Sequence, residues 1–397
     1  MSGTPGFIPE RLREAREANR IPSQAALARL LQIVPSTVSR WEDGSSSPDP
    51  EMLIRLATEL RVRPAFFLRP TFETSRPVFF RSQSSALVRD LNYQRSHMRW
   101  LQEIAGIVQH YVDLPSVDIP DVLKGASYRQ LRDEDIEAIA ADLREHWGLG
   151  VGPCGDMINL LERVGCVVAS IEMGTSKLDG LCSWSADGRP HVLLALDKMS
   201  FARRQMDAGH ELAHAVLHRS VSPEEFRRDL RQIEQQAFRL ASALLLPATS
   251  FVVEARVASL SSFVTLKERW RVSIKAQIKR LADLEAIPPE YAQHLYKMYS
   301  AKGWSRQEPF DSEWPLQQPR VLRDALNLIV DGKVRTKADL LSNEFTHSAA
   351  TVESLCNLPP GWFKFEGEVV RLKAHPPSKM ADGVSRVIEF PRKPTDS

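Results

Sequence analysis

The chain of 397 residues has few cysteines, almost no net charge and no long apolar run. Its four cysteines form no CxxC pair, which excludes a disulfide framework and indicates reduced thiols in a cytoplasmic protein. Because 52 Lys+Arg face 50 Asp+Glu, no basic field covers the whole surface, and a nucleic-acid contact has to come from a local surface. No stretch approaches about 18 uncharged apolar residues, and the N-terminal residues lack the apolar core of a signal peptide. We therefore expect no membrane span and no membrane partner.

What the chain does have is length and an ordinary globular composition, with 43% hydrophobic and 26% charged residues. At roughly 100–200 residues per domain, this length predicts two or three domains. Apolar spacing and turn residues predict an α+β fold that is mostly helical. The predicted helices span 8–68 (five short ones), 84–111, 133–147, 155–164, 200–217, 224–246 and parts of 262–300, and the predicted strands span 165–173, 180–185 and 191–196.

Residues 23–44 have the pattern of two short helices joined by a tight turn. Ser23 is a candidate N-cap of the first helix. The second helix carries small polar and basic side chains that can reach base edges and phosphates, namely Ser36, Thr37, Ser39 and Arg40. The pattern predicts a DNA-binding helix-turn-helix. A small helical bundle that only packs, or that binds another protein, fits the same pattern.

Residues 11–60 resemble the helix-turn-helix domain of XRE/lambda-repressor-like regulators in the SQ step at 23–24, the LA step at 27–28 and the run STVSRWEDG…PDPEMLIRLA. The resemblance implies a five-helix domain in which Trp41 and Glu42 are structural. It implies that the DNA-facing residues are Gln24, Ser36, Thr37, Ser39 and Arg40. Residues 1–70 contain ten Arg and no Lys against eight acidic residues, a net charge of +2. So small a net charge predicts only modest non-specific affinity for DNA. We therefore expect specific binding of a double-stranded operator to require a homodimer.

The segment GHELAHAVLH (209–218) contains the pattern His210-Glu211-x-x-His214. Residues i and i+4 share one face of a helix, so both imidazoles can reach a single Zn²⁺ at about 2.0–2.1 Å. Glu211 lies beside them and can accept a proton from a metal-bound water. The pattern predicts a zinc site with Glu211 as catalytic base. The alternative is an ordinary helix, because HExxH also occurs by chance.

A third zinc ligand has to come from elsewhere. His218 lies about 12 Å from His210 along the helix axis, at 1.5 Å per residue, so one straight helix cannot bring both to a small ion. No glycine between His214 and His218 allows a bend. Glu234 lies at the border of the apolar stripe of the following helix and is the candidate third ligand. A solvated acid at the helix edge is the alternative for Glu234.

Residues 133–247 resemble the ImmA/IrrE-type metallopeptidase domain in LREHWGLGVGP, in GHELAHAVLH and in the ExxA…LLLP segment that ends at Pro247. The resemblance implies that His210, His214 and Glu234 are zinc ligands and that Glu211 is the base of a gluzincin-like endopeptidase. Phe238 departs from the family, which often has Asn after ExxA. Loss of a polar group there would loosen the metal site.

These features predict a helix-turn-helix domain (1–70), a helical linker region (71–132), a zinc-peptidase domain (133–304) and a mixed C-terminal region with a disordered tail (305–397). The predicted function is a DNA-binding transcriptional regulator whose zinc endopeptidase cuts a repressor or other regulatory protein in a stress, mobile-element or phage response. The strand at 191–196 is expected to pair with an extended substrate segment. One alternative is a transcription factor whose silent peptidase fold senses a ligand or partner. Another is an antitoxin-like binding protein.

Overall fold

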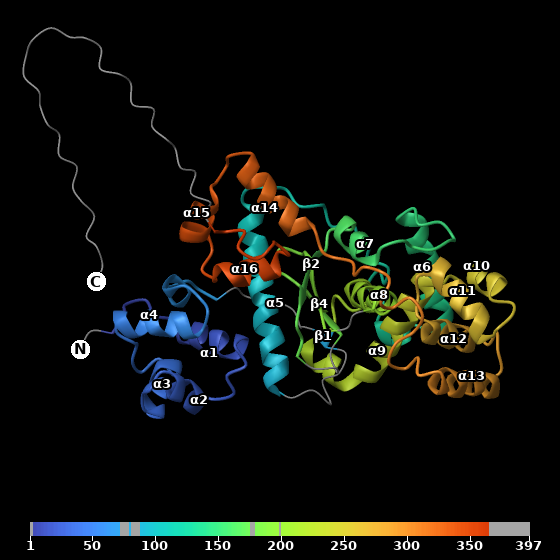
Figure 1. Cartoon of the computed structure of the whole chain (residues 1–397), viewed down its shortest axis with the longest axis horizontal. Coiled ribbons are helices and arrows are strands. Elements are labelled where there is room, and N and C mark those ends of the chain that lie inside the picture. The colour runs from blue at the N-terminus through green and yellow to red at the C-terminus, as the bar shows by residue number, and fades with distance from the viewer. Residues whose placement is uncertain (1–2, 72–78, 81–87, 175–178, 198–199, 365–397) are drawn as a thin grey trace, which may run out of the picture. The chain divides into compact units, whose positions relative to one another are not determined.

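The structure of the chain is a computed structural model that describes residues 3–71, 79–80, 88–174, 179–197 and 200–364. The predicted mostly helical α+β fold is confirmed (Figure 1). The beginning of the helix predicted over 84–111 and the predicted disordered tail lie outside the described residues. No single described helix is long and apolar enough to cross a membrane, and the helix pair 223–245 and 248–254, bent by 67°, passes that test only jointly.

The first five helical segments are those predicted, and the fifth is a short 3₁₀ helix. Their bounds are α1 Pro9–Ala18, α2 Gln24–Leu30, α3 Pro35–Glu42, α4 Pro50–Glu59 and η1 Pro64–Leu68. The Ser23 side chain accepts a hydrogen bond from the Ala26 N–H and so caps α2 as predicted. The helices enclose a core of fully buried aliphatic side chains, among them Leu12, Leu27, Leu31, Val38 and Leu56.

The sheet has four strands in the order β1-β3-β4-β2, with bounds β1 Phe79–Phe80, β2 Val167–Ile171, β3 Gly180–Trp184 and β4 Pro190–Ala195. β4 is parallel to β2 and antiparallel to β3, and β3 is antiparallel to β1. The expectation that the strand at 191–196 pairs with a substrate was wrong, because β2 and β3 already occupy both edges of β4. β1 was not predicted, since two residues are too short to show a period.

The two faces of the sheet contribute to different hydrophobic cores, because successive side chains of a strand point to opposite faces. On one face, Leu181 and Leu193 pack with helix α5 (Val88–Gln109) and with the helix-turn-helix. On the other face, Cys182 and Val192 pack with α7 (Met157–Arg163) and α8 (Phe201–Leu217). Figure 1 shows α5 alongside the strands.

The remaining helices complete these two cores. They are η2 Tyr128–Gln130, α6 Asp133–His146, α9 Pro223–Leu245, α10 Ala248–Glu254, α11 Leu260–Trp270, α12 Ile274–Asp283, α13 Pro289–Ala301, α14 Val321–Asp331, α15 Lys337–Asp339, η3 Leu340–Glu344 and α16 Ala349–Leu355. α14 and α16 pack against β2, on the face that also carries α5. The helix-turn-helix reaches this C-terminal segment through Arg69, whose guanidinium donates hydrogen bonds of 2.7 Å to the Glu344 and Asn343 carbonyls.

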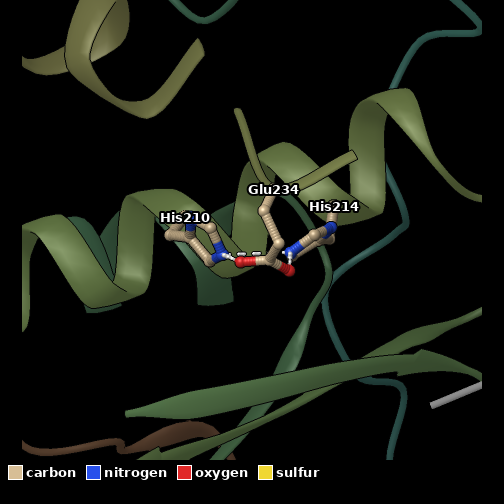
Figure 2. A group of neighbouring side chains, drawn as sticks. All are labelled: His210, His214 and Glu234. Atoms are coloured by element: carbon tan, nitrogen blue, oxygen red, sulfur yellow. Dashed lines mark hydrogen bonds and ion pairs between the residues drawn. The ribbon is translucent and has the colours of Figure 1, made fainter. Parts of the chain in front are cut away.

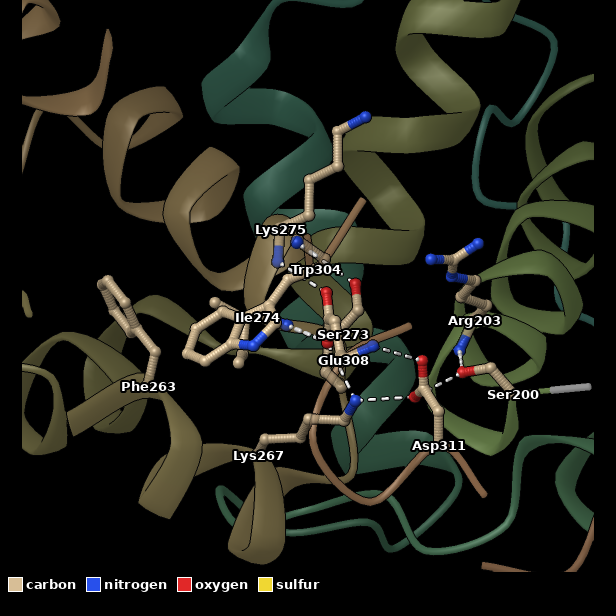
Figure 3. A network of polar contacts seen from close by, with 12 residues as sticks. Ser200, Arg203, Phe263, Lys267, Ser273, Ile274, Lys275, Trp304, Glu308 and Asp311 are labelled. Atoms are coloured by element: carbon tan, nitrogen blue, oxygen red, sulfur yellow. Dashed lines mark hydrogen bonds and ion pairs between the residues drawn. The ribbon is translucent and has the colours of Figure 1, made fainter. Parts of the chain in front are cut away.

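A buried charge network lies where α8, α11 and α12 begin or end (Figure 3). The Lys267 ammonium on α11 lies 2.8 Å from Glu308 and 2.7 Å from Asp311. Asp311 also accepts a hydrogen bond of 2.8 Å from Ser200, the N-cap residue of α8. Glu308 accepts the Ile274 N–H at 2.9 Å, at the first residue of α12. The network therefore holds the beginnings of α8 and α12 in place through one short segment.

Replacing Lys267 with Ala leaves two buried carboxylates without their cation, so we expect a loss of about 3–5 kcal/mol in the free energy of unfolding. Arg269→Ala is the matched control on the same helix, because Arg269 pairs with Glu254 while its own side chain is 56% exposed. That substitution should leave the free energy of unfolding almost unchanged, because an exposed ion pair contributes little to stability. Urea-induced unfolding of both variants checks this prediction, and equal losses would contradict it.

Candidate metal centre

Helix α8 supplies two imidazoles and one carboxylate to the interior. Its N-cap Ser200 accepts a hydrogen bond from the Arg203 N–H. A single turn of the helix separates His210 from His214, so their side chains share a face. His210, Glu211 and His214 are all buried between α9 and the sheet. The predicted helical spacing of the HExxH pattern is therefore realised.

Helix α9 supplies Glu234. It begins with a capping box, in which Ser222 and Glu225 satisfy each other's backbone N–H groups. At Asp229 the backbone leaves helical geometry, with φ −107° and ψ 17°, and the Asp229 carboxylate accepts hydrogen bonds from Tyr128 and Arg129. Beyond this kink, α9 runs along α8 and turns Glu234 toward the histidines.

The three side chains converge on one point (Figure 2). The His210 and His214 Nε2 atoms lie 3.0 Å apart. The Glu234 carboxylate oxygens lie 3.3 Å from His210 Nε2 and 3.4 Å from His214 Nε2. Two ligand atoms bound to one tetrahedral Zn²⁺ at about 2.1 Å are roughly 3.3 Å apart. The spacing of the two imidazole nitrogens and of the carboxylate oxygen nearest to each is therefore close to what a tetrahedral zinc ion requires.

The charge state of Glu234 suits a metal ligand. Burial alone would raise the pKa of its carboxyl, but the His210 and His214 imidazoles together hold that pKa well below the usual range. The carboxylate is therefore ionised at neutral pH, as a metal ligand has to be.

His218 contacts His214 and Gln236. Its Nδ1 lies 3.1 Å from His214 Nδ1, on the side of His214 that faces away from Glu234. Its Nε2 lies 3.1 Å from Gln236 Oε1, and Gln236 in turn donates a hydrogen bond of 2.6 Å to the Tyr128 carbonyl. Such contacts fix the ring orientation of a metal-binding histidine. Burial lowers the pKa of His218 to about 3, so its imidazole is neutral.

Sequence analysis did not identify Gln236 as part of the site. A glutamine at the centre of the apolar stripe, between Ile233 and Ala237, is the signal that could have revealed it. Buried amides need hydrogen-bond partners, and a histidine one helix away is a suitable one.

Gly180, at the start of β3, contacts the predicted base. A Cβ atom at this position would lie 2.7 Å from Glu211 Oε1, closer than real Cβ contacts allow. The absence of a side chain is therefore what allows the Glu211 carboxylate to lie against the strand. Sequence analysis placed Gly180 only as the first residue of the strand predicted over 180–185.

The predicted DNA-facing residues differ in exposure and in their contacts. On α3, Ser36 and Arg40 are exposed one turn apart, and Thr37 and Ser39 are half-buried. Gln24, at the start of α2, instead donates a hydrogen bond of 3.0 Å to the Glu42 carboxylate. Glu42 and Trp41 are buried, which confirms their predicted structural role.

Comparison with protein families matches the two parts of the chain separately. The helix-turn-helix family matches residues 12–67, and the IrrE N-terminal-like domain of the M78 peptidases matches residues 161–282, which include the converging triad. The chain is a fusion of an XRE-type helix-turn-helix domain and an IrrE/ImmA-like domain. The first indicates a DNA-binding regulator and the second a zinc-peptidase-like domain. No curated protein matches the chain.

Phe238 supports the IrrE/ImmA-like site by packing. Its ring centroid lies 4.3 Å from that of His210, with the two planes inclined by 47°. Phe238 therefore contributes an apolar surface against the His210 ring.

A cavity of about 820 Å³ lies beside the triad. Phe238 and Met206 contribute apolar lining, and Arg203 and Lys275 contribute positive charge. Asp179, the residue before Gly180, also lines it, so the cavity continues from the start of β3. The cavity thus has room for part of a peptide near the start of β3.

The geometry predicts different effects for two neighbouring substitutions. Glu234→Ala should lower zinc occupancy, because two imidazoles alone hold the ion poorly. His218→Ala should keep the zinc, because His218 contacts His214 on the side remote from Glu234. Metal analysis of the purified variants, after dialysis against one limiting chelator concentration, checks this. Loss of zinc from His218→Ala together with retention in Glu234→Ala would show that the ligand set is wrong.

Proposed function

We propose that this chain is a cytoplasmic DNA-binding transcriptional regulator with a zinc-dependent endopeptidase. In this proposal His210, His214 and Glu234 bind Zn²⁺, and Glu211 is the catalytic base. The observation that supports it is the convergence of the three side chains: the two Nε2 atoms lie 3.0 Å apart, and each lies 3.3–3.4 Å from one oxygen of the Glu234 carboxylate. The buried Glu211 carboxylate lies next to His210 on α8.

Zinc bound there would polarise a water molecule and the scissile carbonyl. The Glu211 carboxylate accepts a proton from the attacking water and returns it to the amine nitrogen of the leaving peptide. Gly180 provides the space in which this carboxylate lies. His218 and Gln236 keep the His214 ring in a fixed orientation while the proton moves.

We further propose that the protein substrate is a repressor or another regulatory protein of a stress, mobile-element or phage response. The helix-turn-helix domain supports this, because it would bring the peptidase domain to operators where such proteins bind. Confinement on one DNA molecule raises the effective concentration of a substrate, which permits a narrow peptidase with modest intrinsic affinity. A homodimer would match the two half-sites of an operator.

A second candidate function is a transcription factor whose peptidase domain senses a ligand or partner without turnover. Phe238 favours it, because an apolar ring packs on His210 at a position where the resembled family often has Asn. Both candidates share the zinc site and differ only in peptide-bond cleavage.

Glu211→Gln separates the two candidates. The amide cannot accept the proton, so cleavage of a co-expressed or purified candidate repressor should fall by about 10²-fold or more. Zinc content should stay at the wild-type level, because Glu211 is not one of the three converging donors. Mass spectrometry of the digest and metal analysis of the same sample give both readouts. If wild type and variant hold zinc equally and neither cuts any candidate repressor, the result favours the second candidate function, a sensing domain without peptidase activity.

Arg40→Ala tests the DNA-binding surface. Arg40 is exposed on α3, and loss of a base contact there should weaken specific operator binding by about 1–3 kcal/mol. Arg61→Ala is the matched control, because Arg61 is an exposed arginine that follows α4 rather than lying on α3. Titration of a labelled operator at one fixed salt concentration measures both. If both variants lose the same operator affinity, the effect comes from non-specific charge, and the assignment of Arg40 to a base contact is wrong.

A further inference from the structure

The strand next to the proposed base has both edges paired. One edge of β3 bonds to β4, and the other bonds to β1. β1 belongs to the segment that joins the helix-turn-helix to the rest of the chain, since it lies between η1 and α5. A piece of the interdomain segment therefore lies on the sheet edge that borders the metal centre.

β1 runs antiparallel to β3, as a peptide bound by strand addition can do. Phe79 pairs with Cys182 and Phe80 pairs with Leu181, in antiparallel orientation. The chain thus runs toward the start of β3, and the next position on that strand is Gly180, which contacts Glu211. A peptide that binds by strand addition pairs its backbone with an exposed edge in this manner.

A cavity adjoins the start of β3 and could take the rest of such a peptide. Asp179, one residue before Gly180, lines the cavity of about 820 Å³. An extended chain paired along β3 would pass Glu211 and then enter this cavity, beside Phe238. The edge of β3 therefore fits the part of a substrate before the scissile bond, and the cavity fits the part after it.

We propose that β1 occupies the substrate edge of the peptidase domain, so that the interdomain segment competes with any protein substrate. This inference rests on the proposed peptidase function, and it deepens that function by assigning the substrate edge and its occupant. The substrates that displace β1 are extended segments that pair antiparallel with β3. A tethered segment has an effective concentration in the millimolar range, so it competes well even when its intrinsic affinity is low.

A binding experiment tests the occupancy without relying on turnover. The probe is a fluorescent peptide with the sequence of residues 74–86, titrated against the zinc-loaded full chain carrying Glu211→Gln. In the parent chain β1 competes with the probe. Adding Phe79→Pro and Phe80→Pro removes the backbone N–H donors of β1. We expect roughly tenfold tighter binding, the ratio for a competitor at about 1 mM whose dissociation constant is about 0.1 mM.

The matched control is Phe79→Ala with Phe80→Ala, which keeps every backbone donor and should bind the probe within about twofold of the parent chain, because strand pairing is a backbone interaction. Hydrogen exchange of the β3 amides should be faster in the proline chain alone, and addition of the probe should slow it again. A chain in which residues 72–87 are replaced by an equal number of Gly and Ser residues repeats the test without proline. Equal probe affinity in the parent, proline and Gly/Ser chains would overturn the proposal.

The same chains with Glu211 restored distinguish failure of this inference from failure of the proposed function. Tighter probe binding without cleavage of any peptide would support the occupied edge and contradict the peptidase. Cleavage of candidate repressors without any change in probe affinity would support the peptidase and overturn the occupied edge.

Discussion

The contact of α8 with α9 is the interaction on which the site depends. It brings two imidazoles and a carboxylate to within hydrogen-bonding or ion-pair distance in a region from which water is largely excluded. Buried groups of this kind are costly unless each has a partner. The kink at Asp229, the capping box at Ser222 and the network around Lys267 all serve to keep the two helices in that register. A small slip of either helix would leave a buried charge without its partner.

Local patterns in the sequence were sufficient for the helix-turn-helix, for the three longer strands and for the helices that carry the triad. These features repeat within a few residues, and the spacing of apolar side chains reveals them. The family matches confirm the resemblance for both parts of the chain. The assignment of zinc ligands and DNA contacts to particular residues stays a prediction, although the geometry brings His210, His214 and Glu234 together.

The features that sequence analysis did not find depend on contacts between distant segments. Gly180 matters because Glu211, from another element, lies where its Cβ would be. Gln236 matters because it connects His218 to the Tyr128 carbonyl, 108 residues away in the chain. β4 is a short, mostly apolar run that either an edge strand or a central strand can have, and only the pairing pattern shows that it is central. Apart from the polar residue that Gln236 places in an apolar stripe, these relations leave no period or motif in the sequence.

The pairing of β1 with β3 bears on two physical problems that the proposed metallopeptidase would have to solve. A strand edge with unpaired backbone groups is a site for unwanted association, and proteins usually cover it. A peptidase, however, needs such an edge to hold its substrate. A cover of only two residue pairs protects the edge while remaining weak enough for a longer segment to displace. Because β1 lies between η1 and α5, this cover belongs to the segment that leads to the helix-turn-helix. Under the proposed competition, displacement of that segment would change access to the base. The connection between the two domains is thereby part of the site rather than only a tether.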